Sequence, residues 1–188
     1  MTKNLKIALG ILTLLMIVYV INMQSQSQYT SKATELITIN AEDIDRFLIQ
    51  NKDDAIEIAR QDSGWVISGN DTLVVKEQSI DSFLNKVLAV KRGSLVTTKT
   101  EKWGTYSVDD STGTHLALLD EDGNTQAYYV FGRSTSDYGR NYVRTHIDPH
   151  VYLTDESVIY YLRTQPTYWG EKPKVEVPVL DSTNVITE

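Results

Sequence analysis

An uncharged apolar run at the N-terminus constrains this chain more than any other feature of its sequence. Residues 7–23 carry no charged side chain, and Lys3 and Lys6 precede them. A stretch of about 20 apolar residues spans a bilayer, so this run lies at the short end of that range. Because basic flanks stay on the cytoplasmic side, the pattern predicts a cytoplasmic N-terminus at residues 1–6 and a transmembrane anchor over residues 7–23. The rest of this single-pass membrane protein is expected outside the cytoplasm.

A cleaved secretory signal peptide is the alternative interpretation, because its basic start and apolar middle look similar. Such a peptide ends in small residues around its cleavage site, whereas residues 21–24 read Ile-Asn-Met-Gln. We therefore favour an uncleaved anchor. The chain contains no Cys, which leaves it without a residue for a lipoprotein-type anchor, a disulfide or a thiolate metal site.

Acidic residues outnumber basic ones in the rest of the chain. The sequence has 18 Lys plus Arg against 25 Asp plus Glu, a net charge of −7, and leaving out Lys3 and Lys6 makes it −9. An acidic domain repels nucleic acid and anionic lipid, so we expect no nucleic-acid partner. Without disulfides the domain must be stabilised by its core, for which about 140 ordered residues suffice.

Polar segments border the predicted domain on both sides. Residues 24–35 are rich in Gln and Ser and have no apolar period, which predicts a flexible stalk. Residues 171–188 contain Pro173 and Pro178 and alternate charges with valines, which predicts a loosely ordered tail. One extracytoplasmic domain is thus expected over residues 36–170.

Alternating apolar and polar residues predict strands through most of this domain. Turn-forming residues separate several of them, most clearly at residues 120–124, where Gly123 can adopt a positive φ. The predicted strands cover residues 44–50, 55–60, 64–68, 94–98, 115–119, 126–131, 141–145 and 151–153. Their short connections favour antiparallel pairing.

Two segments have a helical pattern instead. Apolar residues recur at helical spacing from Ile80 to Leu88, which predicts an amphipathic helix over residues 77–90. A second, short helix is predicted after Thr154, with Pro166 ending it. The expected fold class is α+β: an N-terminal transmembrane helix followed by one antiparallel-sheet domain with two covering helices, arranged as two β-β-β-α-like halves.

Motifs spread over residues 44–162 resemble the domain of unknown function 4340 family. They comprise Gly64-Trp65-Val66-Ile67, the helix at residues 78–88, residues 103–109, Val130-Phe131-Gly132, residues 142–144 and residues 151–153. The resemblance implies one N-terminal membrane helix and an association with gliding-motility-type ABC transporter components of bacterial envelopes. It therefore implies a membrane-protein partner. The chain departs from the family pattern at Lys76, where a residue such as Asp is expected to cap the helix.

Two clusters have the residue types of metal sites. His146, Asp148 and His150 include two imidazoles and a carboxylate, as zinc sites do, but no third strong ligand lies nearby and His115 is distant in sequence. A hairpin turn around Pro149 explains this cluster better. Residues 120–124 resemble a calcium loop, but their glycine is fourth, where an EF-hand has it sixth. We predict no metal and no cofactor.

Catalytic motifs are missing from the sequence. Asp109 and Asp110 are adjacent carboxylates of the kind used in acid–base catalysis, but Ser111-Thr112-Gly113 marks a solvated loop after them. There is no nucleophile elbow, no phosphate-binding glycine loop and no His-Glu-x-x-His motif. The sequence therefore favours a protein that is not an enzyme, with a hydrolase as the least favoured function.

Tyrosines and a long loop indicate a binding surface. Nine of the 11 Tyr lie from Tyr106 onward, and Tyr and Arg are enriched at interface cores. Half-buried strand positions are the simpler explanation for many of these Tyr residues. The loop at residues 132–141 is long for a hairpin connection, and such loops are often functional. The predicted partner-binding residues in and beside it are Arg133, Tyr138, Arg140, Asn141 and Tyr142.

We therefore expect a membrane-anchored extracytoplasmic interaction domain, accessory to an envelope transporter complex. The alternative is a ligand-binding module for envelope glycans, which the aromatics next to Asp137 and Asn141 suggest. The oligomeric state is left open.

Overall fold

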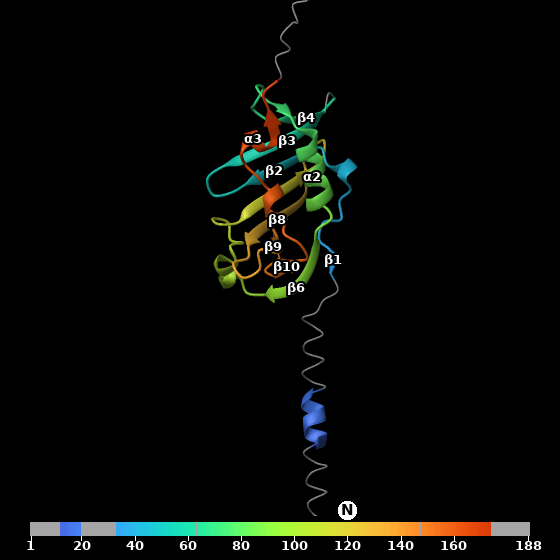
Figure 1. Cartoon of the computed structure of the whole chain (residues 1–188), viewed down its shortest axis with the longest axis vertical. Coiled ribbons are helices and arrows are strands. Elements are labelled where there is room, and N and C mark those ends of the chain that lie inside the picture. The colour runs from blue at the N-terminus through green and yellow to red at the C-terminus, as the bar shows by residue number, and fades with distance from the viewer. Residues whose placement is uncertain (1–11, 20–32, 63, 147, 174–188) are drawn as a thin grey trace, which may run out of the picture.

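The computed structural model describes residues 12–19, 33–62, 64–146 and 148–173. Strands dominate the described part of the chain (Figure 1). The strands are β1 (Thr34–Glu35), β2 (Arg46–Gln50), β3 (Ala55–Gln61), β4 (Gly64–Ile67), β5 (Val74–Val75), β6 (Lys91–Thr97), β7 (Thr114–Leu119), β8 (Thr125–Arg133), β9 (Asn141–Thr145), β10 (Val151–Thr154) and β11 (Gly170–Glu171). The helices among residues 33–173 are α2 (Glu77–Val87) and α3 (Pro166–Trp169), with 3-10 turns η1 (Ala41–Asp43), η2 (Thr100–Lys102), η3 (Gly104–Tyr106) and η4 (Ile159–Tyr161).

Nine strands form one antiparallel sheet. Their order is β1-β6-β10-β9-β8-β7-β2-β3-β4, and β11 pairs with β5 in a separate two-stranded sheet. The predicted strands are all present, with boundaries shifted by up to three residues. The predicted hairpin turn between β7 and β8 is also confirmed, because the backbone N–H of Asn124 donates to the Asp120 carboxylate and Gly123 has a φ of 81°.

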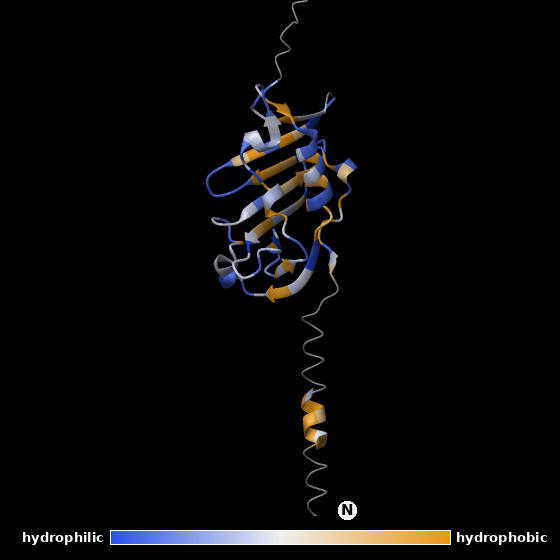
Figure 2. Ribbon diagram, in the orientation of Figure 1, coloured by the Kyte–Doolittle hydropathy of each residue, from blue (hydrophilic) through white to orange (hydrophobic). Residues whose placement is uncertain are grey.

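One face of this sheet carries the main hydrophobic core. Phe47 of β2 pairs with Ile58 and Leu118 on the neighbouring strands, and all three side chains are fully buried. Side chains alternate between the two faces of a strand, so the apolar residues at every second position of these strands share this face. Helix α2 covers it with its buried stripe, Ile80, Phe83 and Val87. Figure 2 shows the apolar colour concentrated on the strands beneath α2.

The opposite face has a smaller apolar cluster. Val108, Val130 and Val151 are buried there, with Trp103 and Tyr106 packed against them. The covering segment runs from η2 to the start of β7 and contains the turns η2 and η3. Its close approach requires glycine at position 132, because a Cβ there would overlap the carbonyl oxygen of Tyr106. Part of the sheet is therefore covered on both faces.

The predicted second covering helix is wrong. Between Thr154 and Pro166 the chain is irregular apart from η4, and Pro166 begins α3 where it was expected to end a helix. Pro is suited to the first helical turn because a backbone N–H at that position has no intrahelical acceptor, so a residue without an N–H is tolerated there. The backbone N–H groups of Val158 and Ile159 donate to the Asn141 side chain. Side chain–backbone bonds of this kind compete with helix formation.

The predicted fold class needs two further corrections. The domain is mostly an antiparallel sheet with few helices, and nearly all strands belong to one sheet instead of two halves. Among the described residues, no helix is long and apolar enough to cross a membrane. The predicted transmembrane helix is thus not found, although residues 7–11 and 20–23 of that prediction lie outside the described residues.

The predicted segments at the two ends are only partly described. Residues 24–32 of the expected stalk and residues 174–188 of the expected tail lie outside the described residues. Strand β1 falls within residues 24–35, and it pairs with Lys91 and Arg92 of β6.

The packing of α2 predicts the effect of truncating Phe83. We expect Phe83→Ala to lower the free energy of unfolding by about 3–5 kcal/mol, because it leaves a cavity against Phe47 and Trp169. Urea unfolding followed by circular dichroism measures this change. Asn85→Ala, an exposed position on the same helix, is the control and should change the free energy by less than about 0.5 kcal/mol. Equal effects of the two substitutions would contradict this packing.

Candidate partner-binding site

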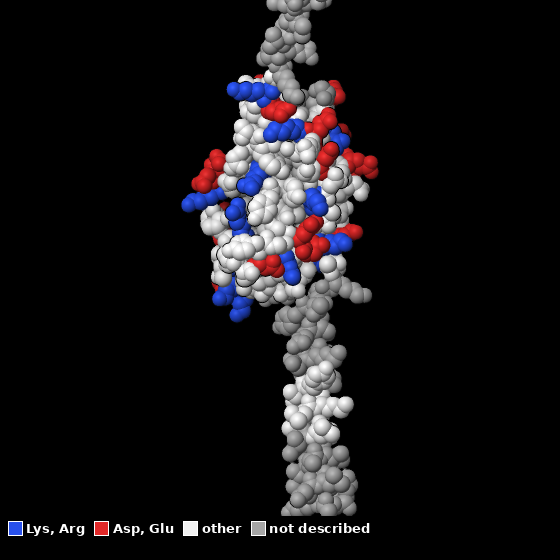
Figure 3. Space-filling view, viewed as in Figure 1, with Lys and Arg blue, Asp and Glu red and all other residues white. Residues whose placement is uncertain are grey.

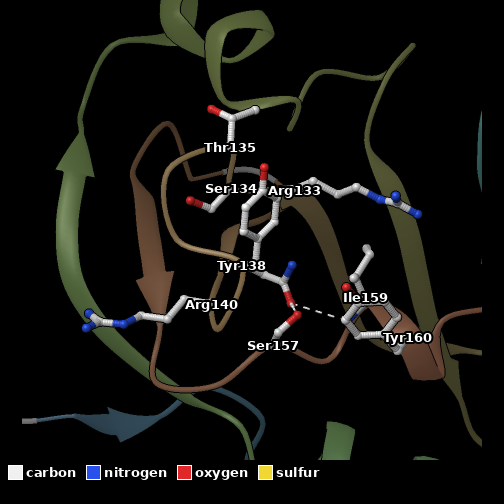
Figure 4. A pocket seen from close by; sticks show the side chains of 9 residues that line it. Arg133, Ser134, Thr135, Tyr138, Arg140, Ser157, Ile159 and Tyr160 are labelled. Carbon is white, nitrogen blue, oxygen red and sulfur yellow. Dashed lines mark hydrogen bonds between the residues drawn. The ribbon is translucent and has the colours of Figure 1, made fainter.

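A pocket lies where β8 and β9 are joined, next to η4 (Figure 4). Its volume is about 230 Å³. The lining side chains come from the end of β8, the β8–β9 connection, the start of β9 and the segment after β10: Arg133, Ser134, Thr135, Tyr138, Arg140, Asn141, Ser157, Ile159 and Tyr160. Two segments distant in sequence therefore build one site.

Strand pairing brings the ends of β8 and β9 together on the α2 side of the sheet. Arg133 is the cross-strand partner of Asn141, so the two side chains share one face. Their neighbours Gly132 and Tyr142 pair next to them and face the opposite side. The pairing thus places Arg133 and Asn141 at one pocket and excludes Tyr142 from it.

Asn141 is the buried centre of the site. Its Oδ1 accepts hydrogen bonds from the Ser157 hydroxyl at 3.1 Å, the Val158 N–H at 2.7 Å and the Ile159 N–H at 3.2 Å. Its Nδ2 donates to the Gly132 carbonyl at 3.3 Å. One amide therefore fixes the segment leading into η4 against the end of the sheet.

The β8–β9 connection is ordered by its own hydrogen bonds. The Ser134 hydroxyl, which is buried, accepts from the Asp137 N–H at 3.0 Å. The Asp137 carboxylate accepts from the Gly139 N–H at 3.0 Å and pairs with Arg140 Nε, also at 3.0 Å. These short-range bonds hold Tyr138 at the tip of the loop.

The outer part of the pocket is aromatic and cationic. Tyr138 is 79% exposed and Tyr160 is 55% exposed, and both rings are visible at the front of Figure 4. The guanidinium groups of Arg133 and Arg140 point to opposite sides of these rings. Arg140 is held by Asp137, whereas no described residue pairs with Arg133. Exposed Tyr and Arg at the rim of a fixed pocket are suited to binding a partner.

Four of the five residues predicted from the sequence line this pocket: Arg133, Tyr138, Arg140 and Asn141. Tyr142 does not, because it packs edge-on against Tyr106 at 4.8 Å in the smaller core. The sequence interpretation missed Ser157, Ile159 and Tyr160. It assigned their segment to a helix, and no local signal shows that Asn141 binds this segment.

A second polar cluster lies on the opposite face, around Arg144. This side chain is 2% exposed and stacks on Trp103 at 3.9 Å. Its Nε donates to the Val108 carbonyl at 2.5 Å, and its Nη2 pairs with Asp110 at 2.6 Å. Burying a guanidinium requires such partners. Arg144 thus holds the covering segment of residues 100–113 on the sheet.

The adjacent carboxylates at positions 109 and 110 have separate structural partners. Asp109 accepts hydrogen bonds from the side chains of Ser111 and Thr112, both at 2.5 Å, and from their backbone N–H groups. These bonds hold the pKa of the Asp109 carboxyl well below its usual range. Asp110 pairs with Arg144. The two adjacent carboxylates are therefore held by different partners and not by each other.

The three histidines do not converge. His150 Nδ1 is hydrogen-bonded to Asp148, and His146 packs on the Tyr128 ring at 4.7 Å. His115 lies between the Tyr128 hydroxyl at 2.8 Å and the Asp110 carbonyl oxygen at 3.2 Å. In the described part of the chain, no group of three His, Cys, Asp or Glu side chains is placed to hold a metal ion.

Burial raises the pKa of the Tyr128 hydroxyl, and the negative charge of Asp110 raises it further.

Comparison with known proteins identifies a family. A family model described as Domain of unknown function (DUF4340) matches residues 65–185, which is more than half of the chain. The match includes α2, β8, β9 and η4, and so every residue that lines the pocket. No curated protein and no solved structure matches the chain. The family description states no activity, so the functional interpretation depends on the chemistry of the site.

Removal of the Asn141 amide should destabilise the domain. We expect Asn141→Ala to lower the free energy of unfolding by about 1–3 kcal/mol, because it leaves the buried N–H groups of Val158 and Ile159 without an acceptor. Urea unfolding measures the change. Thr135→Ala, an exposed lining position, is the control and should stay within about 0.5 kcal/mol of the wild type. An Asn141→Ala protein as stable as this control would show that the network does not form.

The lowered pKa of Asp109 predicts a stability difference at acid pH. A carboxyl that titrates lower in the folded chain stabilises the fold above its unfolded pKa of about 3.9, and this contribution is lost as pH falls below that value. Wild-type protein should therefore lose more stability between pH 6 and pH 2 than Asp109→Asn. Urea midpoints across this range measure the difference. Parallel curves for the two proteins would refute the assignment.

Proposed function

We propose that this chain, which belongs to the DUF4340 family of domains of unknown function, is an interaction domain that binds a partner protein at the pocket between β8, β9 and η4. The observation that carries the proposal is the exposure of Tyr138 and Tyr160 on a base that is already fixed by the chain itself. Burial of exposed aromatic rings on such a base gives binding energy with little ordering cost.

The base of the pocket favours a protein over a glycan. A glycan-binding site needs free hydrogen-bonding groups for the sugar hydroxyls. The Asn141 amide, the Ser157 hydroxyl and the Ser134 hydroxyl are instead bonded within the chain. The side chains that remain for the ligand are mainly the Tyr138 and Tyr160 rings and the Arg133 and Arg140 guanidinium groups, with the Thr135 hydroxyl beside them. Tyr and Arg are enriched at protein interfaces.

The proposal extends to the location and class of the partner. A location outside the cytoplasm is supported by the basic start and apolar middle of residues 1–23, a pattern that export signals share. A membrane-protein partner, in particular a component of an ABC transporter, is supported by the family resemblance. Both supports come from the sequence.

Site-directed crosslinking in cells tests the proposal. A photo-crosslinking amino acid at Thr135, on the pocket wall, should form one dominant adduct with a membrane protein. The same amino acid at Lys172, an exposed position outside the pocket, is the matched control and should not form it. Adding Tyr138→Ala should reduce the Thr135 adduct about fivefold or more, because interface aromatics cost more than about 1 kcal/mol when truncated.

Two outcomes would overturn the proposal. One is an identical adduct from both positions, and the other is a Thr135 adduct that Tyr138→Ala leaves unchanged. Circular dichroism of each variant shows that a lost adduct is not due to unfolding.

A further inference from the structure

We infer that the pocket recognises an acidic peptide segment of its partner, extended across the rings of Tyr138 and Tyr160 between Arg133 and Arg140. This inference rests on the proposed function and specifies its ligand. The observations that carry it are the charge of the pocket, the directions of its arginines and its volume.

The lining of the pocket has the opposite charge to the chain as a whole, with Asp137 beside it paired to Arg140. Its lining includes two arginines and no acidic residue, although the chain as a whole has a net charge of −7. A larger depression beside β2 and β7 is lined instead by five acidic residues: Glu42, Asp43, Asp45, Asp120 and Glu121. Elsewhere, acidic and basic side chains are interspersed on the face seen in Figure 3. Among the described pockets, this site is therefore the one placed to attract an acidic group.

The arginines are arranged for an extended ligand. Figure 4 shows the guanidinium groups of Arg133 and Arg140 on opposite sides of the Tyr138 ring. Arg140 uses Nε for Asp137 and retains its Nη groups, and Arg133 has no partner among the described residues. Carboxylates at two positions of one segment match these two donors.

The volume between the arginines suits an apolar side chain. A volume of about 230 Å³ lies below the roughly 300–1,000 Å³ of sites that enclose whole small molecules. Ile159 at its base is buried, and the rings of Tyr138 and Tyr160 flank the opening. One aliphatic side chain of the partner fits such a space, with acidic residues on both sides of it.

Fluorescence anisotropy with three labelled probes tests this ligand class on the full chain. The probes are the peptide Glu-Glu-Leu-Glu-Glu, its neutral analogue Gln-Gln-Leu-Gln-Gln, and oligogalacturonate as an acidic glycan. We expect the acidic peptide to bind at least tenfold more tightly than either other probe, and its binding to weaken with added salt. Equal binding of the neutral peptide, or tighter binding of oligogalacturonate, would overturn the inference.

Charge reversal localises the binding. Arg133→Glu should weaken binding of the acidic peptide about tenfold, since this side chain has no partner to lose among the described residues. Arg140→Gln should weaken it less, because this substitution only removes a positive charge, whereas Arg133→Glu replaces one with a negative charge. Gln is used at position 140 because Glu would place a second carboxylate beside Asp137. Lys172→Glu, with the same change of charge as Arg133→Glu at an exposed position outside the pocket, is the control. Equal losses for Arg133→Glu and Lys172→Glu would mean that only net charge matters, and would refute the site.

The crosslinking partner separates this inference from the proposed function. Loss of the Thr135 adduct with Tyr138→Ala but not with Arg133→Glu would refute the acidic segment and leave the interaction domain standing. An adduct insensitive to both substitutions would refute both proposals. Loss with both substitutions supports both.

Discussion

The stacked rings of Phe47 and Phe83 hold this domain together. Their centroids are 4.1 Å apart, and Trp169 closes the cluster at 5.3 Å from Phe47 and 5.8 Å from Phe83. The three rings come from β2, α2 and α3, so one contact joins the sheet, its covering helix and the C-terminal segment. Trp169 also donates its indole N–H to the Arg163 carbonyl at 2.7 Å. The path of the chain after β10, and with it one wall of the pocket, therefore depends on this core.

Polar networks position two segments of the chain that the apolar core does not hold in place. Asn141 fixes the start of η4 on one face of the sheet, and Arg144 fixes the segment of residues 100–113 on the other. Both residues are on β9 and both are buried, so their polar groups require internal partners. The result is a rigid base beneath an exposed aromatic and cationic rim. A rigid base of this kind reduces the entropy that a ligand must lose on binding.

Local patterns were accurate where the local environment decides the structure. Period-two alternation predicted the strands of the sheet, and the apolar stripe from Ile80 to Leu88 predicted α2, because each pattern needs only one buried face. The same approach failed after Thr154. There the local residues suited a helix, but Asn141, on another strand, binds the backbone N–H groups of Val158 and Ile159. The transmembrane helix predicted from the apolar N-terminal run is likewise not found among the described residues.

The sequence by itself determined the strand-rich character of the domain, its acidic charge and the loop that contains Arg133, Tyr138 and Arg140. These are properties of composition and of neighbouring residues. Only the tertiary structure decided the order of the nine strands, the separation of Asn141 and Tyr142 onto opposite faces, and the meeting of the loop with Tyr160. Contacts between residues far apart in sequence depend on how the whole chain buries its apolar surface, and no local pattern carries that information.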